Sequence, residues 1–245
     1  LEIEQLQISK PGPHEVLIRT AAAGVCHSDL HFVEGSYPFP LPAVIGHESA
    51  GVVEAVGSEV RTVKVGDHVI TCLSAFCGHC DQCLTGHLSL CVSPETKRGG
   101  DEEPRLSQGG SPLPQFLNLS SFAEYMLIHE HACVAIRKDM PLDRAALIGC
   151  AVTTGVGAVI NTAKVRPGET VTVIGCGGIG LSAINGAFIA GAGRIIAIDT
   201  SPTKLALARK FGATDTVDPA AGDPVAQIKE MTGGGVHHSF EAVGL

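Results

Sequence analysis

The chain has 245 residues, of which 44% are hydrophobic, and a formal net charge of −8 at pH 7. This length and apolar content are enough for one or two domains with hydrophobic cores of their own. The negative charge argues against nucleic acid and anionic membranes as partners, because both attract a clustered positive surface. No apolar run approaches the roughly 20 residues that cross a bilayer. We therefore predict a globular protein with neither a nucleic-acid nor a membrane partner.

The cysteines number nine, which is odd, and the opening segment LEIEQLQISKPGPHEVLIRT is amphipathic and does not resemble a secretory signal peptide. Clustered thiols in such a chain point to metal binding or catalysis rather than to disulfides, and to a reducing compartment. We therefore predict a cytoplasmic protein.

The first half of the chain is predicted to be rich in β-structure. The segments HEVLIRTAAAGV, AVIGHESAGVVEAVG and GDHVITC are short runs of Val, Ile and Thr. Gly, Pro and Asp turns separate these runs at close spacing, as in a domain made mainly of strands. We place this domain at residues 1–153.

The second half, from about Val165, alternates between strand and helix patterns. Strands are predicted at Thr170–Cys176, Arg194–Thr200, Asp215–Val217 and His238–Val243. One helix is predicted over SPTKLALARKFGA, from the cap Ser201 to Gly212, and another around Asp223–Met231. This alternation predicts an α/β fold with a doubly wound parallel sheet of the Rossmann type at residues 154–245. Because a complete dinucleotide fold has about six strands, we expect the chain to be part of a longer protein, with residues missing at both ends.

The sequence GCGGIG, after the first of these strands, fits the glycine fingerprint of dinucleotide-binding proteins. Gly175 would make the tight turn, Gly177 would admit a pyrophosphate, and Gly180 would let strand and helix pack closely. Gly178 lies within the motif as a further cofactor-binding candidate, and the helix N-terminus offers free N–H groups to phosphate. Asp199 ends the next strand and can accept hydrogen bonds from both hydroxyls of the adenosine ribose. Because a carboxylate repels a 2′-phosphate, we predict NAD rather than NADP.

Two points about this motif stay open. The glycine turn could serve only to pack the strand against its helix. Lys204 could reach the edge of the ribose, or it could be an ordinary solvated lysine of the helix.

The stretch CGHCDQCLTGHLSLC has the spacing of a tetrahedral thiolate site. Its four cysteines, Cys77, Cys80, Cys83 and Cys91, would close the coordination sphere and leave no position for a substrate. Zn²⁺ is the expected metal of this lobe, which spans about residues 72–95. An iron–sulfur cluster is the competing interpretation, although the spacing differs from that of ferredoxins.

A catalytic zinc needs about three protein ligands and an open position, and therefore must be held elsewhere. Cys26 in GVCHSDLH and His47 in VIGHESAG each follow a short predicted strand, and Cys150 in LIGCAVTTG could supply a second thiolate. Asp29 and Glu48 lie beside these residues as possible hydrogen-bonding partners of the ligands. Spacing alone leaves open that the cysteines belong to the core and that the histidine is structural.

Together these motifs resemble the zinc-dependent alcohol dehydrogenases of the medium-chain dehydrogenase/reductase superfamily. GVCHSDLH, GHESAGVVEAVG, GDHVI, the four-cysteine lobe, GCAVTTG and GCGGIGLSAINGA occur in the family's order and approximate spacing, over essentially the whole chain. The resemblance implies a GroES-like catalytic domain before the Rossmann domain, two Zn²⁺ per chain, and NAD. It also implies a small-molecule alcohol or aldehyde substrate and a homo-oligomer, either a dimer or a tetramer.

By this resemblance, Cys26, His47 and Cys150 are the catalytic zinc ligands, and the four cysteines of the lobe bind a structural zinc. Asp29 would hydrogen-bond the far nitrogen of His47, and Glu48 would sit behind the metal.

The resemblance also assigns residues to substrate and cofactor. Ser28 matches the substrate-side hydroxyl of the family, and His31 matches the end of its proton relay. His27 would contact the cofactor pyrophosphate, and Thr154 and Ile179 would pack against the nicotinamide. The implied reaction removes the alcohol proton beside zinc and passes hydride to the nicotinamide.

The polar segment SPETKRGGDEEPRLSQGGSPLPQFLNLSS, which we expect to be a loop over the substrate cleft, leaves two enzyme functions open. One is oxidation of a primary or secondary alcohol, and the other is a formaldehyde dehydrogenase acting on a glutathione or mycothiol adduct. Arg98 and Arg105 could bind a carboxylate of such an adduct, or they could be solvated cations beside Asp101–Glu103. A zinc-binding structural module or a crystallin-like relative is the non-enzymatic alternative. The negative charge and the presence of all three catalytic-zinc candidates argue against it.

Overall fold

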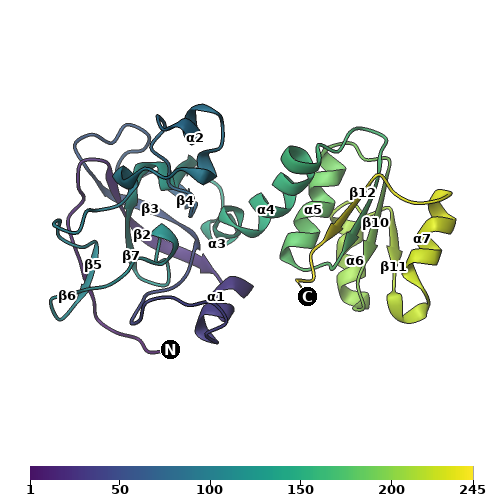
Figure 1. The fold of residues 1–245 in the computed structure, drawn as a ribbon, viewed down its shortest axis with the longest axis horizontal. Helices are drawn as coiled ribbons and strands as arrows, with labels where there is room; N and C mark the ends of the chain where they lie inside the picture. The colour runs from purple at the N-terminus through teal and green to yellow at the C-terminus, as the bar shows by residue number, and fades with distance from the viewer. Residues whose placement is uncertain (245) are drawn as a thin grey trace. The chain divides into compact units, whose positions relative to one another are not determined.

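The computed structural model of the protein describes residues 1–244. The chain forms two compact units, which divide between Cys150 and Ala151. Figure 1 draws the first unit in purple to teal and the second in green to yellow. The boundary predicted at residues 153–154 falls inside helix α4 (Ala151–Gly157), which the contacts assign as a whole to the second unit.

A five-stranded antiparallel sheet forms the centre of the first unit. Its strands stand in the order β7 (Tyr125–His129), β2 (Glu15–Gly24), β3 (Glu48–Val56), β4 (His68–Thr71) and β8 (Cys133–Ile136). Along β2, Val16 and Ile18 are buried and Arg19 is exposed, because alternate side chains of a strand point to opposite faces. The prediction of a β-rich first half is therefore confirmed.

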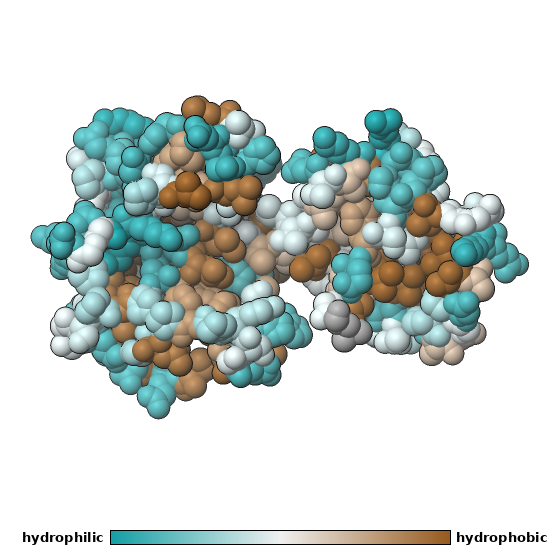
Figure 2. Space-filling view, viewed as in Figure 1, coloured by the Kyte–Doolittle hydropathy of each residue, from teal (hydrophilic) through white to brown (hydrophobic). Residues whose placement is uncertain are grey.

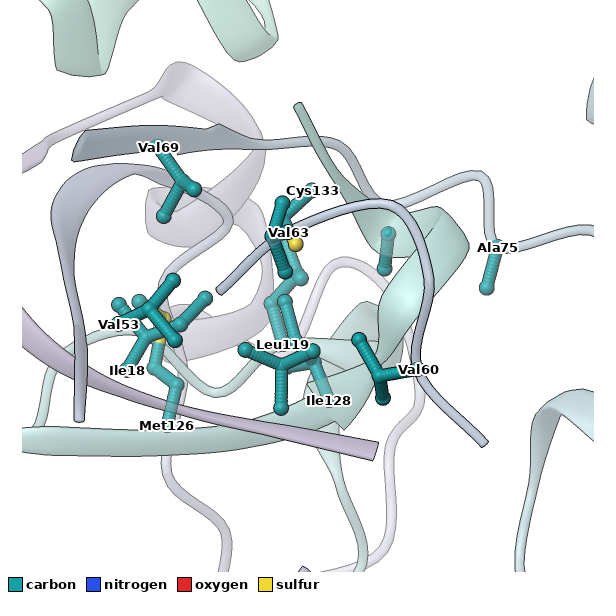
Figure 3. Close-up of a cluster of buried hydrophobic side chains, with 12 residues drawn as sticks. Ile18, Val53, Val60, Val63, Val69, Ala75, Leu119, Met126, Ile128 and Cys133 are labelled. Carbon is teal, nitrogen blue, oxygen red and sulfur yellow. The ribbon is translucent and has the colours of Figure 1, made fainter. Parts of the chain in front are cut away.

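Valine, isoleucine and other apolar side chains of this sheet form the main core of the first unit (Figure 3). Ile18, Val53 and Ile128 come from the strands, and Val60 and Leu119 come from the connecting segments. Burying one such side chain contributes about 1.5–3 kcal/mol, so the sheet is held mainly by these contacts.

Short elements surround the sheet. A small antiparallel sheet contains β1 (Gln7–Ile8), β5 (Leu106–Gln108) and β6 (Ser111–Pro112). The helices are α1 (His27–Val33), α2 (Asp81–Leu84) and α3 (Leu142–Ala145), with 3₁₀ turns η1 (Leu88–Leu90), η2 (Pro94–Thr96), η3 (Phe116–Asn118), η4 (Glu130–Ala132) and η5 (Ala146–Gly149). The polar segment that we expected to be a loop thus contains two short strands, β5 and β6.

Four parallel strands form the sheet of the second unit. Their order is β11 (Asp215–Val217), β10 (Arg194–Ile198), β9 (Thr170–Ile174) and β12 (His238–Glu241). In chain order this is 3-2-1-4, the arrangement with which a doubly wound dinucleotide fold begins. The strand order reverses between β9 and β12, and sheets of this class bind ligands at such a point, beyond the carboxyl ends of the strands. All four predicted strands are present.

Helices cover both faces of this sheet. They are the π-helical turn η6 (Ala158–Ala163), α5 (Gly178–Ile189), α6 (Pro202–Lys210), the 3₁₀ turn η7 (Pro219–Ala221) and α7 (Pro224–Thr232). Ile195 and Ala197 of β10 share a core with η6, α5 and α6, whereas Ile196 and Ile198 face α7. A continuous apolar run thus serves two cores, and the predicted doubly wound sheet is confirmed.

Among residues 1–244, no single helix is both long and apolar enough to cross a membrane. The broken pair Leu142–Gly149 and Ala151–Ala163 meets that length and composition only when its two parts are counted together. Hydrophobic residues reach the visible surface of both units and lie among hydrophilic ones (Figure 2).

Candidate metal and cofactor sites

The four cysteines of the predicted structural-zinc lobe come together around α2, which is labelled in Figure 1. The Sγ atoms of Cys77 and Cys83 lie 3.9 Å apart. Cys80 Sγ lies 3.5 Å from Cys83 Sγ and 3.9 Å from Cys91 Sγ. A tetrahedral Zn²⁺ with bonds of about 2.3 Å would hold its sulfurs about 3.8 Å apart, whereas a disulfide joins them at about 2.05 Å. The four thiols therefore fit a closed thiolate site.

The backbone of this lobe directs N–H groups at the sulfur atoms. The N–H of Cys77 donates to Cys91 Sγ, and the N–H of Cys80 donates to Cys77 Sγ, both at 3.3 Å. Backbone N–H groups, that of His79 first, lower the pKa of Cys77 to about 6. Burial raises the pKa of Cys83 to about 11. Cys83 thus resists ionisation, whereas Cys77 ionises readily. A bound cation would be needed to ionise all four thiols together.

Cys26, His47, Glu48 and Cys150 form the second group of potential ligands. One donor atom from each residue lies within 4.8 Å of all the others. The Sγ atoms of Cys26 and Cys150 are 4.0 Å apart, close to the separation that a tetrahedral zinc requires. The two thiols and the imidazole alone would make an incomplete coordination sphere, as in catalytic zinc sites, with the Glu48 carboxylate beside them. The structure thus brings together the three ligands predicted for the catalytic zinc.

Three separate elements deliver these ligands. Cys26 follows β2 and is the N-cap of α1, His47 directly precedes β3, and Cys150 directly follows η5. A Cβ atom on Gly149 would lie 2.2 Å from the carbonyl oxygen of Thr71, at the end of β4. Only glycine therefore lets the backbone before Cys150 approach the sheet so closely.

Asp29 connects the parts of this site. Its side chain is 2% exposed and accepts a hydrogen bond from Nδ1–H of His47 at 3.1 Å. This bond leaves Nε2 of His47 as the nitrogen available to a metal. Asp29 also accepts hydrogen bonds from the N–H of Cys26 at 3.0 Å and from the N–H of Gly46 at 3.2 Å. These two backbone contacts were not predicted, although an acid three residues after a helix cap is a recognisable capping signal.

Three groups that can carry a negative charge, Cys26, Glu48 and Cys150, lie close together in this second ligand group. Burial raises the pKa of the Cys150 thiol above its ordinary value, and the nearby Cys26 and Glu48 add to this effect. Glu48 is 3% exposed, and a Cβ on Gly24 would lie 2.5 Å from its Oε2. Buried groups of like charge are costly unless a cation accompanies them, so the donor set fits a divalent metal ion.

The residues predicted to move a proton lie on α1. Ser28 and His31 are half-buried and lie three positions apart, which places them on neighbouring turns of one helix face. The ring of His31 lies 5.0 Å from that of His27 and 5.3 Å from that of Tyr37, between centroids. His27 is exposed at the first turn of α1. The roles of these residues stay predictions.

Each glycine of the fingerprint meets a different constraint. Gly175 follows β9 with a φ of +89°, a left-handed conformation that favours glycine. A Cβ on Gly180 would lie 1.8 Å from the carbonyl oxygen of Gly175, so a side chain there would separate α5 from the strand. A Cβ on Gly177 would meet nothing within 4 Å among the described residues. The absence of packing around Gly177 fits close approach of a ligand, and the exposed Gly178 begins α5 beside it.

Asp199 lies beside this turn, directly after β10. It accepts hydrogen bonds from the N–H of Cys176 at 2.8 Å and from the N–H of Ser201 at 2.9 Å. Nζ of Lys204 is 3.8 Å from Oδ2 of Asp199. Burial alone would raise the pKa of Asp199, but the two N–H groups and Lys204 hold it below its usual value. A charged carboxylate therefore stands at the predicted ribose position, with Lys204 as its ion-pair partner.

The residues predicted to face the nicotinamide lie on α4 and α5. A Cβ on Gly155 would lie 2.4 Å from the carbonyl oxygen of Ile179, so glycine allows the two helices to pack closely. Thr154 is exposed on α4, and Ile179 is 40% exposed on α5. Their assignment to the nicotinamide stays a prediction.

The interpretation of the two arginines as solvated cations beside Asp101–Glu103 was wrong, whereas their binding of a carboxylate stays a prediction. Glu15, 6% exposed on β2, accepts hydrogen bonds from Nε of Arg98 at 3.0 Å and from Nε of Arg105 at 2.7 Å. Arg105 is itself 7% exposed, and its Nη2 donates to the carbonyl oxygen of Thr96 at 3.0 Å. The arginines are not solvated loop cations, because Glu15 on β2, a strand distant in sequence, pairs with both of them. Sequence analysis did not identify Glu15.

This arrangement defines a class of protein, a dehydrogenase that carries a closed thiolate site, an open metal site and a dinucleotide fold on one chain. Residues 12–138 match the family model described as Alcohol dehydrogenase GroES-like domain, and residues 178–245 match the one described as Zinc-binding dehydrogenase. The chain belongs to the zinc-dependent alcohol dehydrogenases of the medium-chain dehydrogenase/reductase superfamily.

Individual relatives agree with this membership. S-(hydroxymethyl)glutathione dehydrogenase of Photobacterium damsela subsp. piscicida is 45% identical over 251 residues, which cover 100% of this chain and 68% of that protein. The crystal structure of benzyl alcohol dehydrogenase from Acinetobacter calcoaceticus has a TM-score of 0.90 and 39% identity, covering 100% of this chain and 67% of that one. An alcohol dehydrogenase zinc-binding domain protein from Burkholderia ambifaria has a TM-score of 0.92 and 43% identity, with the same coverage.

The predicted family, the fold class and the assignment as an oxidoreductase are thereby confirmed. Use of zinc and of a nicotinamide dinucleotide is characteristic of this family, and the two groups of cysteine and histidine ligands agree with it.

Proposed function

We propose that the protein oxidises a primary or secondary alcohol to an aldehyde or ketone with zinc and NAD, and catalyses the reverse reaction. The observation that carries this proposal is the meeting of Cys26, His47 and Cys150, whose donor atoms lie within 4.8 Å of one another. Three protein ligands leave a metal position for substrate, which a site closed by four cysteines does not.

The chain's own residues supply orientation and proton transfer. When bound, Zn²⁺ lowers the pKa of an oxygen that it contacts, and NAD accepts hydride. Asp29 holds the imidazole of His47 in the tautomer that presents Nε2. Ser28 would accept the hydroxyl proton of the substrate while giving up its own proton, and the half-buried His31, at the solvent end of the relay, would release a proton to solvent.

The test of this proposal uses the full-length, zinc-loaded protein. We expect reduction of NAD with at least one simple alcohol, loss of this activity on chelation, and its recovery when zinc is returned. A zinc-loaded protein that reduces NAD with no alcohol and with no formaldehyde–thiol adduct would contradict the proposal.

The preference for NAD over NADP follows from Asp199. Its carboxylate would bind the ribose hydroxyls and repel a 2′-phosphate. Asp199→Ala should therefore reduce the ratio of kcat/KM with NAD to that with NADP by about tenfold or more, since a hydrogen bond to a charged group contributes about 1.5–3 kcal/mol. Lys210→Ala, a change of an exposed lysine in the last turn of α6, is the control and should leave the ratio unchanged. An unchanged ratio in Asp199→Ala would exclude the ribose role.

A second candidate is thiol-dependent formaldehyde dehydrogenase. Relatives named S-(hydroxymethyl)glutathione dehydrogenase, 45% identical to this chain, favour it. Rates with simple alcohols, compared with rates for formaldehyde plus glutathione or mycothiol, distinguish the two functions. Activity that appears only with a thiol would assign the second.

We further infer a small-molecule substrate, a homo-oligomer and a cytoplasmic location, from the family and from the number of free cysteines. Sedimentation of the full-length protein and fractionation of cells that produce it would test the last two.

A further inference from the structure

Two buried hydroxyl groups lie at the ends of β3 and β4, beside the open metal site formed by Cys26, His47 and Cys150. Ser49 is 0% exposed and Thr71 is 1% exposed. Their side-chain oxygens are 2.6 Å apart, and the Thr71 hydroxyl also donates to the carbonyl oxygen of Ser49 at 3.3 Å. Neither residue is a predicted ligand or proton-transfer group. Because buried hydroxyls are costly unless they are hydrogen-bonded, this pair is a firm link between the two strands.

The hydroxyl pair stands where the backbone pairing of these two strands stops. The last paired residues are Ala50 of β3 and Ile70 of β4. In this antiparallel register Ser49 faces Thr71 one position further on, yet their backbones do not continue the ladder. A side-chain hydrogen bond therefore takes the place of the next backbone pair.

The ladders on either side of these two strands continue further. β2 and β3 stay paired as far as Gly24 and Glu48. β4 and β8 stay paired as far as Thr71 and Cys133. At this end the sheet is thus divided into two parts, β2 with β3 and β4 with β8, and the hydroxyls of Ser49 and Thr71 join them. We call the gap between the two parts the β3–β4 seam.

The predicted metal ligands are distributed across this seam. Cys26 follows β2 and His47 precedes β3, so both belong to the first part. Cys150 follows η5, and the residue before it lies against the second part, because a Cβ atom on Gly149 would be 2.2 Å from the carbonyl oxygen of Thr71. The width of the seam therefore affects where Cys150 lies relative to the other two ligands.

The turn η5 rests on both parts of the sheet. On the side of β2, a Cβ atom on Gly24 would lie 2.9 Å from Cδ2 of Leu147. Because η5 is in close contact on both sides of the seam, a change in the width of the seam would shift η5 and with it Cys150. The Sγ atoms of Cys26 and Cys150 are 4.0 Å apart, close to the separation that one tetrahedral zinc requires.

We propose that Ser49 and Thr71 are positioning residues of the open metal site, whose hydrogen bond holds the β3–β4 seam at the width that lets His47 and Cys150 bind one ion. This inference rests on the proposed function, since it takes these two residues as ligands of the same metal. Asp29 fixes the ligands on one side of the seam. The hydroxyl pair ties that side to the strand that supports the remaining ligand.

Removal of one hydroxyl tests the proposal in the full-length, zinc-loaded protein. Thr71→Val keeps the branched shape that suits a strand. In competition with a chelator, the open site should hold zinc about three- to tenfold more weakly, the scale of one net hydrogen bond. The zinc of the four-cysteine lobe is the internal reference and should be held as before. Thr71→Ser keeps the hydroxyl and should retain zinc as the parent does. Unchanged retention in Thr71→Val, or equal weakening of both zinc ions, overturns the inference.

A double variant separates positioning from stability. Thr71→Val takes a partner from the buried hydroxyl of Ser49, which by itself lowers stability. Ser49→Ala combined with Thr71→Val removes both hydroxyls, and replacing both partners by apolar groups is nearly neutral for folding. Tm of the double variant should therefore return towards that of the parent, whereas zinc in the open site should stay weakly held. Recovery of zinc retention together with Tm overturns the inference.

Thr20→Val is the matched control. Thr20 lies on β2 of the same sheet, and its buried hydroxyl oxygen has no hydrogen-bond partner among residues 1–244. This variant should hold both zinc ions as the parent does, and an equal loss from its open site overturns the inference. A parent protein that holds fewer than two zinc ions would instead contradict the proposed function. Two zinc ions in the parent, with variants that do not differ from it, contradict only the role of the hydroxyl pair.

Discussion

The two metal-ligand clusters of the first unit contain similar chemical groups and are built in opposite ways. The closed cluster takes all four thiols from one segment, Cys77 to Cys91, wound around α2. The open cluster takes Cys26, His47 and Cys150 from the ends of three elements that are distant in sequence. Spacing within one segment can therefore set a structural site, whereas a site for chemistry here depends on the packing of the whole sheet.

The comparison also shows how each cluster controls its ligands. In the closed cluster, backbone N–H groups point at sulfur atoms at 3.3 Å. In the open cluster, the buried carboxylate of Asp29 orients His47 and also binds the backbone before α1 and before β3. One acid thus positions two of the three ligands, and the third depends on the close approach at Gly149.

Removing a ligand from the open cluster is the largest expected effect. His47→Ala should retain one zinc per chain instead of two and should lose at least about 10³-fold in kcat/KM, because the metal contributes several kcal/mol to catalysis. Metal analysis and NAD reduction measure the two quantities. Cys72→Ala, at a half-buried cysteine outside both clusters, should keep two zinc ions. Two zinc ions in His47→Ala would show that the ligand set is wrong.

Removing a ligand from the closed cluster should reduce stability rather than catalysis. Cys80→Ala should also keep one zinc ion. Loss of the structural site should lower the free energy of unfolding by at least about 3 kcal/mol, or Tm by roughly 6–12 °C. Thermal unfolding and limited proteolysis within residues 72–95 report this loss. An unchanged Tm together with lost activity would mean that the two clusters had been assigned the wrong way round.

The buried carboxyl of Glu130, which belongs to neither metal-ligand cluster, gives a stability effect that can be compared with the loss of a zinc site. Burial raises the pKa of Glu130, but hydrogen bonds from the N–H groups of Arg61 and Thr62, the side chain of His14 and the hydroxyl of Thr62 lower it to about 2. A depressed carboxyl pKa stabilises the folded state above the unfolded value of 4.5 and loses that contribution as pH falls towards 2. The loss should reach about 3 kcal/mol.

Chemical unfolding between pH 7 and pH 2 tests this expectation. Glu130→Gln should be less stable at neutral pH and should show a shallower decline in acid. Glu124→Gln, at an exposed glutamate just before β7, is the matched control and should follow the parent protein. Parallel curves for the parent and Glu130→Gln would exclude the effect.

The smallest expected effect concerns the residue behind the open cluster. Asp29→Asn should weaken retention of the catalytic zinc by about 10- to 100-fold, as loss of a partner of a metal-bound histidine does. Competition with a chelator measures the change, and the structural zinc provides an internal reference in the same molecule. Equal weakening of both zinc ions would point to a general loss of folding and not to a positioning role for Asp29.

Much of the fold was predictable because its signals are local. The apolar run of β10, the helix cap at Ser201 and the fingerprint glycines each show their role within a few residues. The alternation of strand and helix predicted a doubly wound parallel sheet, whereas its strand order, 3-2-1-4, was seen only in the structure. The boundary between the two units, at the start of α4, was harder to predict, because the sequence pattern does not mark where that helix begins.

The polar segment was the hardest part to predict. Its charged residues suggested a solvated loop, yet Arg98 and Arg105 meet Glu15 inside the first unit. A charged side chain shows in the sequence, but its partner does not, because ion pairs form between segments that the fold alone brings together. For the same reason, the contact between the rings of Phe116 and His47 was not foreseen.

The sequence by itself determined the closed thiolate lobe, the glycine turn and the strand-helix alternation, since each depends on interactions between residues a few positions apart. Only the tertiary structure decided that Cys26, His47 and Cys150 meet, that Asp29 holds two of them, and that Glu15 pairs with two arginines. Residues that are close in sequence meet as soon as the local backbone has formed. Contacts between distant residues exist only after the sheet has packed.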